Sequence, residues 1–425
     1  MRDVFAQRKR GWSGAAIAAC LAPEWLQASP AIGGWTDLPE ICPTIGPAAS
    51  FAHSRIYSLK PTRLVSLDVF RGLTVALMLL VNNPGDWGHI PAPLAHADWN
   101  GCTLADLVFP FFLFIVGVSV AYGLAGAKAV APGAALGAVA RRAAMLGGLG
   151  LFASTWLDFD LATLRLPGVL MRIALVYFFA ALVYLKTDWR GQFLLIISLL
   201  AGYAALMQLV PVPGFGPANL NPDTNLGAWL DRTVLGTAHL WKESRTWDPE
   251  GLLGTLPATA TALLGLLAGQ WLRATNRPAP QKITGLLLGG LLAVALGLAW
   301  SRWFPLNKAL WSPSYALLTS GLAVLVLAVL YWVCDVRGSR WWVTPWQALG
   351  TNALAAFFGS SIIARTLNRL LVADHTPLKD WLFRHGIAPW FANPYAASLA
   401  GALVCLLIWG AVLGFLYRRG WVWSV

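Results

Sequence analysis

The chain has 425 residues, of which 57% are hydrophobic and only 12% are charged, and its formal net charge is +12. A soluble domain carries about twice that share of charged residues, so the composition excludes an ordinary soluble protein. The excess of Lys and Arg is typical of the cytoplasmic loops of a membrane protein, and we do not expect it to bind nucleic acid. The five cysteines show no CxxC spacing and no metal-ligand pattern with histidine, so we expect neither a disulfide nor a metal site.

Residues 1–60 differ in composition from the remainder of the chain. They are rich in Ala, Gly, Pro and Ser, and prolines recur from Pro23 to Pro47, which interrupts any helix. We expect this stretch to be a disordered or non-native N-terminal extension. The membrane domain is expected to occupy residues 61–425.

Ten apolar blocks follow from residue 64, each close to the ~20 residues that a helix needs to cross a bilayer. Their hydrophobicity is continuous rather than alternating, which favours helices over a β-barrel. The sequence therefore predicts an all-α polytopic membrane protein. The expected segments are 64–83, 104–126, 136–156, 167–186, 191–210, 251–272, 281–303, 309–334, 345–366 and 395–417.

Lys and Arg gather in alternate connections and at both ends of the membrane domain, as at Lys128, Arg141 and Arg273. The other connections are longer and carry most of the Asp and Glu. The positive-inside rule then predicts that both termini are cytoplasmic and that loops 84–103 and 211–250 face outward.

The outward loop between the first two segments carries His96, followed by Trp99 and Asn100. A histidine held between two membrane helices is a candidate acid or base. Asp106 opens the second segment, where it either caps the first helical turn or orients His96.

Three polar residues, Asp68, Arg71 and Asn82, interrupt the apolar first segment. Arg71 and Asn82 are eleven residues apart, so a helix places them on one face with a rise of ~16 Å between them. This polar stripe is either an anchor for an anionic cytoplasmic molecule that reaches towards His96, or an Asp68–Arg71 pair that only orients the helix.

Other polar residues are less informative. Arg172 lies within the fourth segment and needs an acid, a phosphate or water as partner. Asn352, in the ninth segment, is either a packing amide or a site ligand. The outer loop contributes His239, Asp248 and Glu250, which are candidate acceptor-binding residues or simply solvated.

Several of these residues stand in runs that resemble heparan-α-glucosaminide N-acetyltransferase and its bacterial transmembrane relatives. A more distant likeness, through Asp68 and Arg71, is to the acyltransferase-3 membrane enzymes. The runs that carry the resemblance are 63–72, 81–82, 96–101, 105–110, 167–170, 211–214, 248–251, 307–308, 310–312 and 350–352.

The resemblance implies that residues 61–425 are an acyltransferase domain of a bacterial inner membrane. It implies transfer of acetyl from cytosolic acetyl-CoA to a glucosamine-type amino sugar on the periplasmic side, and also a homodimer. His96 matches the family's catalytic histidine, and Asn82 matches the asparagine beside it. Asp98 departs from the Ser or Pro that is usual there.

The expected mechanism follows the polar stripe. Arg71 and Arg172 are expected to hold the phosphates of acetyl-CoA, and Asp68 and Asn352 are further acetyl-CoA-binding candidates. The thioester is then presented near Asn82, where His96 takes a proton from the acceptor amine. The expected hydrogen-bond donor to the oxyanion is Asn82, Asn100 or the Trp99 indole. Two alternatives remain open: an amino-sugar transporter, and an O-acetyltransferase of an envelope polysaccharide.

Overall fold

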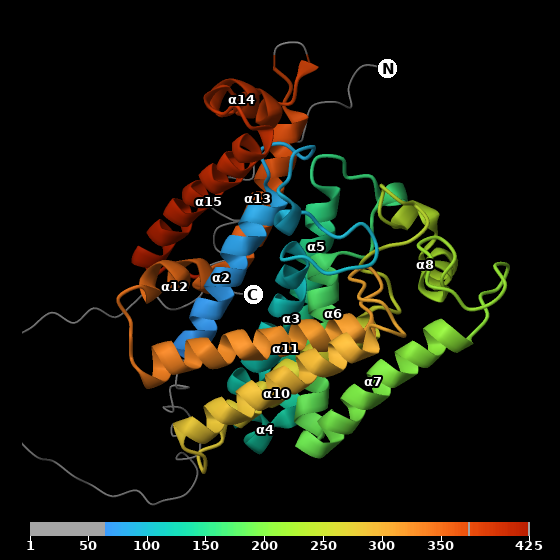
Figure 1. The fold of residues 1–425 in the computed structure, drawn as a ribbon, viewed down its shortest axis with the longest axis vertical. Coiled ribbons are helices and arrows are strands. Elements are labelled where there is room, and N and C mark those ends of the chain that lie inside the picture. Colours follow the sequence, from blue (N-terminus) through green and yellow to red (C-terminus); the bar gives the residue numbers. More distant parts are fainter. Residues whose placement is uncertain (1–63, 373–374, 424–425) are drawn as a thin grey trace, which may run out of the picture. The chain divides into compact units, whose positions relative to one another are not determined.

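The computed structural model describes residues 64–372 and 375–423, and their regular structure is helical (Figure 1). The predicted all-α fold is confirmed for these residues, while the expected N-terminal extension lies outside them. The helices are α2 Val65–Asn82, α3 Val108–Gly123, α4 Ala125–Val130, α5 Pro132–Thr155, α6 Val169–Lys186, α7 Trp189–Leu209, α8 Leu226–Leu235, α9 Thr255–Arg273, α10 Ala279–Trp300, α11 Pro313–Leu330, α12 Val343–Thr351, α13 Ala353–Arg369, α14 Leu378–Gly386 and α15 Pro394–Arg418.

Eight helical spans within the described part of the chain are long and apolar enough to cross a membrane. They coincide with eight of the ten expected segments and include α2, α3 and α15. The chain is thus a polytopic helical membrane protein.

The other two expected segments are helical but differ from a long apolar span. Segment 251–272 forms α9, which is largely buried among its neighbours. Segment 345–366 is two helices rather than the single one expected, because Asn352 (φ −111°, ψ 37°) leaves the helical conformation between α12 and α13.

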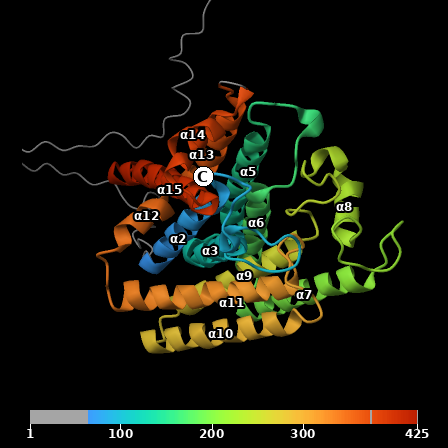
Figure 2. The same ribbon diagram turned by 45° about the horizontal axis from the view of Figure 1, so that its top comes forward.

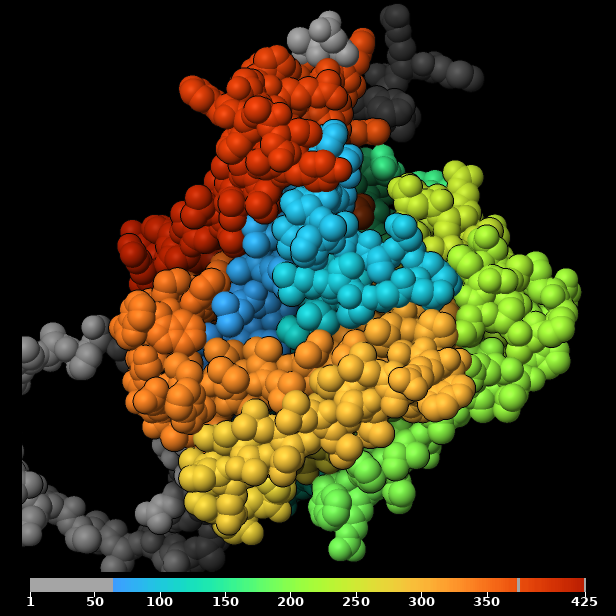
Figure 3. Space-filling view, viewed as in Figure 1, coloured from blue at the N-terminus to red at the C-terminus, as the bar shows by residue number. Residues whose placement is uncertain are grey.

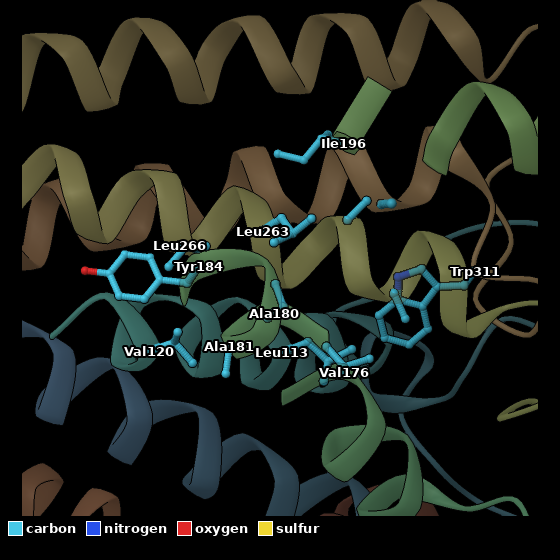
Figure 4. Packing of buried hydrophobic residues seen from close by; sticks show 14 of the residues in the cluster. Leu113, Val120, Val176, Ala180, Ala181, Tyr184, Ile196, Leu263, Leu266 and Trp311 are labelled. Carbon is cyan, nitrogen blue, oxygen red and sulfur yellow. The ribbon is translucent and has the colours of Figure 1, made fainter. Parts of the chain in front are cut away.

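Helices α3 and α9 pack with their backbones in direct contact. A Cβ atom added at Gly117 would lie 1.8 Å from the Ala262 carbonyl oxygen, and one at Gly265 would lie 2.1 Å from that of Phe114. Small residues let membrane helices approach to backbone contact, where dispersion replaces the missing hydrophobic driving force. Beside this crossing, Leu113, Leu263 and Trp311 belong to one buried cluster (Figure 4).

The outer helices present apolar side chains away from the domain. On α10, Leu288, Leu291 and Leu292 are exposed, and α15 exposes Leu407 and Ile408. Figures 2 and 3 show α10 alongside α11 at the surface of the helical domain. Exposed leucines of this kind suit contact with lipid, since a bilayer core is as apolar as the side chains themselves.

The first turn of α2 is capped from a distant part of the chain. The backbone amides of Val65 and Ser66 donate to the two carboxylate oxygens of Asp335, at 3.1 and 3.0 Å. A carboxylate at this position satisfies amides that lack partners within the helix and complements the positive end of its dipole. It fixes the beginning of the helix that carries Arg71 and Asn82.

Gly117→Ala should destabilise the protein, because the new methyl group meets backbone atoms of α9 that cannot rotate away. Overpacking of this kind costs ~1–3 kcal/mol. Gly148→Ala is the matched control: its Cβ would meet nothing within 4 Å, and alanine favours the helix by ~1 kcal/mol over glycine. Thermal unfolding in detergent should separate the two variants, and equal midpoints would contradict the α3–α9 packing.

Candidate functional site

A cavity of about 770 Å³ follows one face of α3 from end to end. Its volume is within the range of small-molecule sites. The spacing of three and four residues along α3 gives this face a length of ~28 Å, close to the ~30 Å core of a bilayer. The lining residues of this face, from just before α3 to just after it, are Ala105, Val108, Phe109, Phe112, Ile115, Val116, Ser119, Val120, Gly123 and Leu124.

Near the start of α3 the cavity is lined by His96, whose ring is fixed by Asp106. The His96 Nδ1 and Asp106 Oδ1 atoms are 2.8 Å apart. Because a carboxylate only accepts hydrogen bonds, this contact favours the tautomer with the proton on Nδ1 and Nε2 as the acceptor atom. Such a histidine can accept a proton from a bound molecule.

Of the two roles that the sequence left open for Asp106, the structure shows the contact with His96, and it shows no side-chain cap of the first helical turn. Its Oδ2 atom accepts the backbone amides of Thr103 (3.0 Å) and Ala97 (3.2 Å), while Oδ1 faces His96. The carboxylate therefore closes the loop at the start of α3 and orients the imidazole at the same time. Its side chain is 1% exposed, so water does not compete for these bonds.

Lys308 joins this pair from the connection between α10 and α11. Its Nζ atom lies 3.4 Å from Asp106 Oδ1, and 3.1 and 3.4 Å from the two ring nitrogens of His96. Burial lowers the pKa of Lys308, while the charges of Asp106 and Glu250 oppose that change. The sequence interpretation did not select this residue for the site, although Lys308 stands in the run 307–308 that carries the family resemblance.

Arg71 and Asn82 line the same cavity, as the polar stripe on α2 predicted. Arg71 donates to Ser119 Oγ at 2.9 Å and lies 3.6 Å from Asp68. Asp68 is buried and does not line the cavity. Arg142, from α5, adds a second guanidinium to the lining. The cavity thus has His96 and Lys308 towards one end of α3, with Arg71 beside Ser119 towards the other.

Glu250 also lines the cavity, paired with Arg165, which the sequence interpretation did not single out. Arg165 donates to both oxygens of Asp248, at 2.8 and 2.7 Å, and to Glu250 at 2.5 Å. Asp248 is held in this bidentate ion pair and does not line the cavity, whereas Trp241 and Glu250, which is also paired with Arg165, do line it.

Arg172 does not line the cavity. It is fully buried, and its guanidinium donates to the carbonyl oxygens of Pro249 (3.0 Å) and Gly251 (2.8 Å). We therefore no longer assign it to phosphate binding. It shapes the loop that presents Glu250.

Four further candidates serve to hold loops and do not line the cavity. The Trp99 indole donates to the Leu220 carbonyl oxygen at 3.1 Å, so it is not available to an oxyanion. Asn100 accepts a hydrogen bond from Asn307, and the Nδ1 atom of His239 bonds the Leu164 carbonyl oxygen. Asn352 bonds the backbone of Trp421 and Trp423.

Over residues 64–372 and 375–423, no three His, Cys, Asp or Glu side chains cluster as metal ligands.

Comparison with known proteins decides the family. Residues 63–295 match the model of the heparan-alpha-glucosaminide N-acetyltransferase catalytic family. The chain belongs to this family. The human heparan-alpha-glucosaminide N-acetyltransferase is 30% identical over 427 residues, which cover 87% of this chain and 61% of the human protein. The mouse protein of that name is 27% identical, over 85% of this chain and 60% of its own length.

The chain thus spans about three fifths of the length of these curated relatives. The part that matches the heparan-alpha-glucosaminide N-acetyltransferase family includes Asn82, His96, Asp106 and Glu250. Lys308 lies beyond the matched residues and is brought to His96 by the fold.

Asp231, on α8, is a buried carboxyl. Its Oδ1 atom accepts a hydrogen bond from the Leu252 amide at 2.8 Å. Burial raises its pKa to about 7, against the effect of that hydrogen bond. The folded protein therefore keeps the proton that the unfolded chain releases near pH 4. The carboxyl's contribution to stability is full below about pH 4 and falls as pH rises to about 7.

Asp231→Asn should remove this pH dependence while keeping an oxygen for the Leu252 amide. The variant should gain thermal stability over the parent protein as the pH is raised from 5 to 8, because the parent must then bury a charge. Unfolding midpoints in detergent across this range measure the difference. A constant difference at all pH values would show that Asp231 does not titrate there.

Proposed function

We propose that this protein is a transmembrane acetyltransferase that moves acetyl from cytosolic acetyl-CoA to the amino group of a glucosamine-type sugar on the extracytoplasmic side. The observation that carries the proposal is the cavity along α3, with Arg71 and Arg142 towards one end and His96, held by Asp106, towards the other. Family membership supports the reaction type.

The donor would enter at the arginine end. Arg71 and Arg142 line the cavity there, and guanidinium groups suit phosphate oxygens because they offer paired donors with a permanent charge. The apolar lining of α3, including Phe112 and Ile115, would accompany the pantetheine arm towards Asn82. A cavity about as long as the bilayer core is thick lets a thioester reach the far side without the nucleotide crossing.

The reaction would take place at His96. The acceptor amine attacks the thioester carbonyl, a carbon–nitrogen bond forms, and collapse of the tetrahedral intermediate breaks the carbon–sulfur bond. His96 Nε2 takes the amine proton and returns a proton to the leaving thiolate. Asn82 and Lys308 line the cavity beside it and would stabilise the oxyanion. An acetyl-His96 intermediate is the alternative route.

The acceptor would bind where Glu250, Arg165 and Trp241 line the cavity near Lys308. A carboxylate attracts the ammonium form of an amino sugar, and an indole offers an apolar face to a sugar ring. Asp248 and His239, which were expected to share this role, do not line the cavity, and they bond Arg165 and the Leu164 carbonyl oxygen instead. Glu250 therefore remains the acceptor residue in our proposal.

His96→Ala should abolish most transfer from acetyl-CoA to glucosamine, since general acid–base catalysis supplies ~10²–10⁴-fold in rate. His89→Ala is the matched control. His89 lies in the same loop and pairs with a carboxylate, Asp86, at 2.6 Å, but it does not line the cavity. Turnover of purified protein in detergent measures both variants, with acetyl-CoA binding as the check on folding.

Two results would contradict the function. Near-normal turnover of the His96→Ala protein, with lower thermal stability, would make the histidine a structural residue. Uptake of glucosamine into vesicles without acetylation would favour the transporter instead. Replacing glucosamine by a sugar with hydroxyl groups only tests O-acetylation.

The proposed orientation has both termini in the cytoplasm of a bacterial inner membrane, with the His96 loop facing the periplasm; a homodimer is part of the same proposal. Ala238→Cys, in the outward loop 211–250, should react in intact cells with an impermeant thiol reagent, in a background without other cysteines. Asn276→Cys, between α9 and α10, should react only after lysis. Both positions are exposed, so access to the reagent depends on sidedness alone. The reverse pattern would invert the orientation.

A further inference from the structure

The chain turns back on itself after α15. Gly420 has φ +69°, a conformation that favours glycine, and its amide donates to the Tyr417 carbonyl at 3.0 Å. The Trp421 amide donates to the Leu416 carbonyl at 2.9 Å. These bonds end the helix and direct residues 421–423 towards the rest of the domain.

Asn352 holds this returning segment. Its side-chain Nδ2 donates to the Trp421 carbonyl oxygen at 3.1 Å, and its Oδ1 accepts the Trp423 amide at 2.9 Å. Asn352 is fully buried at the break between α12 and α13, so both bonds are protected from water. An amide is the side chain that supplies one donor and one acceptor at this spacing.

The segment brings Trp423 into the lining of the large cavity. Its ring contacts Phe358 at 5.5 Å between centroids, and 41% of the residue is exposed. Asn352, which bonds the Trp423 amide, is two residues from Gly350, and a Cβ atom on Gly350 would be 3.4 Å from Arg71 Cβ. Trp423 therefore lies towards the end of the cavity that Arg71 lines. Arg142 lines the same cavity.

We propose that Trp423 binds the adenine ring of acetyl-CoA by stacking, and that Asn352 is the residue that positions it. This inference rests on the proposed function. Every nucleobase offers a π-face to an aromatic side chain. The phosphates of acetyl-CoA are attached close to its adenine, so a stacking residue near Arg71 and Arg142 matches the order of groups in the donor. Asn352 thus serves donor binding through Trp423 and does not contact the donor itself.

A donor without the nucleotide tests the stacking. Trp423→Ala should raise the KM for acetyl-CoA roughly ten-fold with kcat nearly unchanged, because loss of a stacked base typically costs that much affinity. With S-acetylpantetheine, which lacks adenosine and its phosphates, the KM should be equal in both proteins. Trp423→Phe should recover most of the loss. Trp341→Ala, at an exposed tryptophan away from the cavity, is the control expected to match the parent protein.

The positioning role of Asn352 is tested by a double-mutant cycle. Asn352→Ala alone should raise the KM for acetyl-CoA, but in the Trp423→Ala background it should add nothing, because the contact it maintains is already absent. An additive effect, or an equal effect on S-acetylpantetheine, would mean that Asn352 only stabilises the fold.

Binding of adenosine 3′,5′-bisphosphate to purified protein separates this inference from the function. Calorimetry should detect binding to the parent protein and at least ten-fold weaker binding to Trp423→Ala. If the parent binds and the variant binds equally well, the stacking proposal fails while the transferase stands. If the parent binds neither this probe nor CoA, the donor itself is wrong. Equal KM losses with both donors would make Trp423 a plug of the cavity and overturn the proposal.

Discussion

The site depends on the carboxylate of Asp106 at the entry to α3. A buried carboxylate requires several donors, since desolvation of an unpaired charge is costly. Here the donors are two loop amides, the His96 ring and the Lys308 ammonium, which come from the loop before α3 and from the connection after α10. Satisfying one charge thus fixes the loop, the imidazole orientation and the approach of α10 and α11 together.

Helix α3 combines two different surfaces. One carries Gly117, where the backbone of α9 comes too close for any side chain. Another carries larger residues such as Phe112 and Ile115, which line the cavity. Backbone contact on one side and larger side chains on the other let one helix both pack against α9 and line the cavity along its whole length.

Arg165 and Arg172 both bond residues 248–251, but they stabilise different parts of that segment. Arg172 is buried and bonds backbone carbonyl oxygens, so it fixes the path of residues 249–251. Arg165 bonds the carboxylates of Asp248 and Glu250 and reaches the cavity. The guanidinium fork makes several bonds from one centre, which lets a loop without regular structure hold a fixed shape. Glu250 is placed at the cavity by these bonds rather than by a helix.

The sequence by itself determined that the chain folds into membrane helices and that the site extends along one polar face of the first of them. Long apolar blocks can satisfy their backbone only as helices in a bilayer, and helical periodicity put Arg71 and Asn82 on one face. Only the tertiary structure decided the partners. Lys308 is 212 positions from His96, and Asn352 meets Trp423 across 71 positions, so no local pattern relates either pair. Arg172 was expected at the donor phosphates but bonds backbone carbonyl oxygens, and the cause is the same. A helix position shows that a charge is buried, but long-range packing decides whether that charge faces a ligand or a backbone carbonyl.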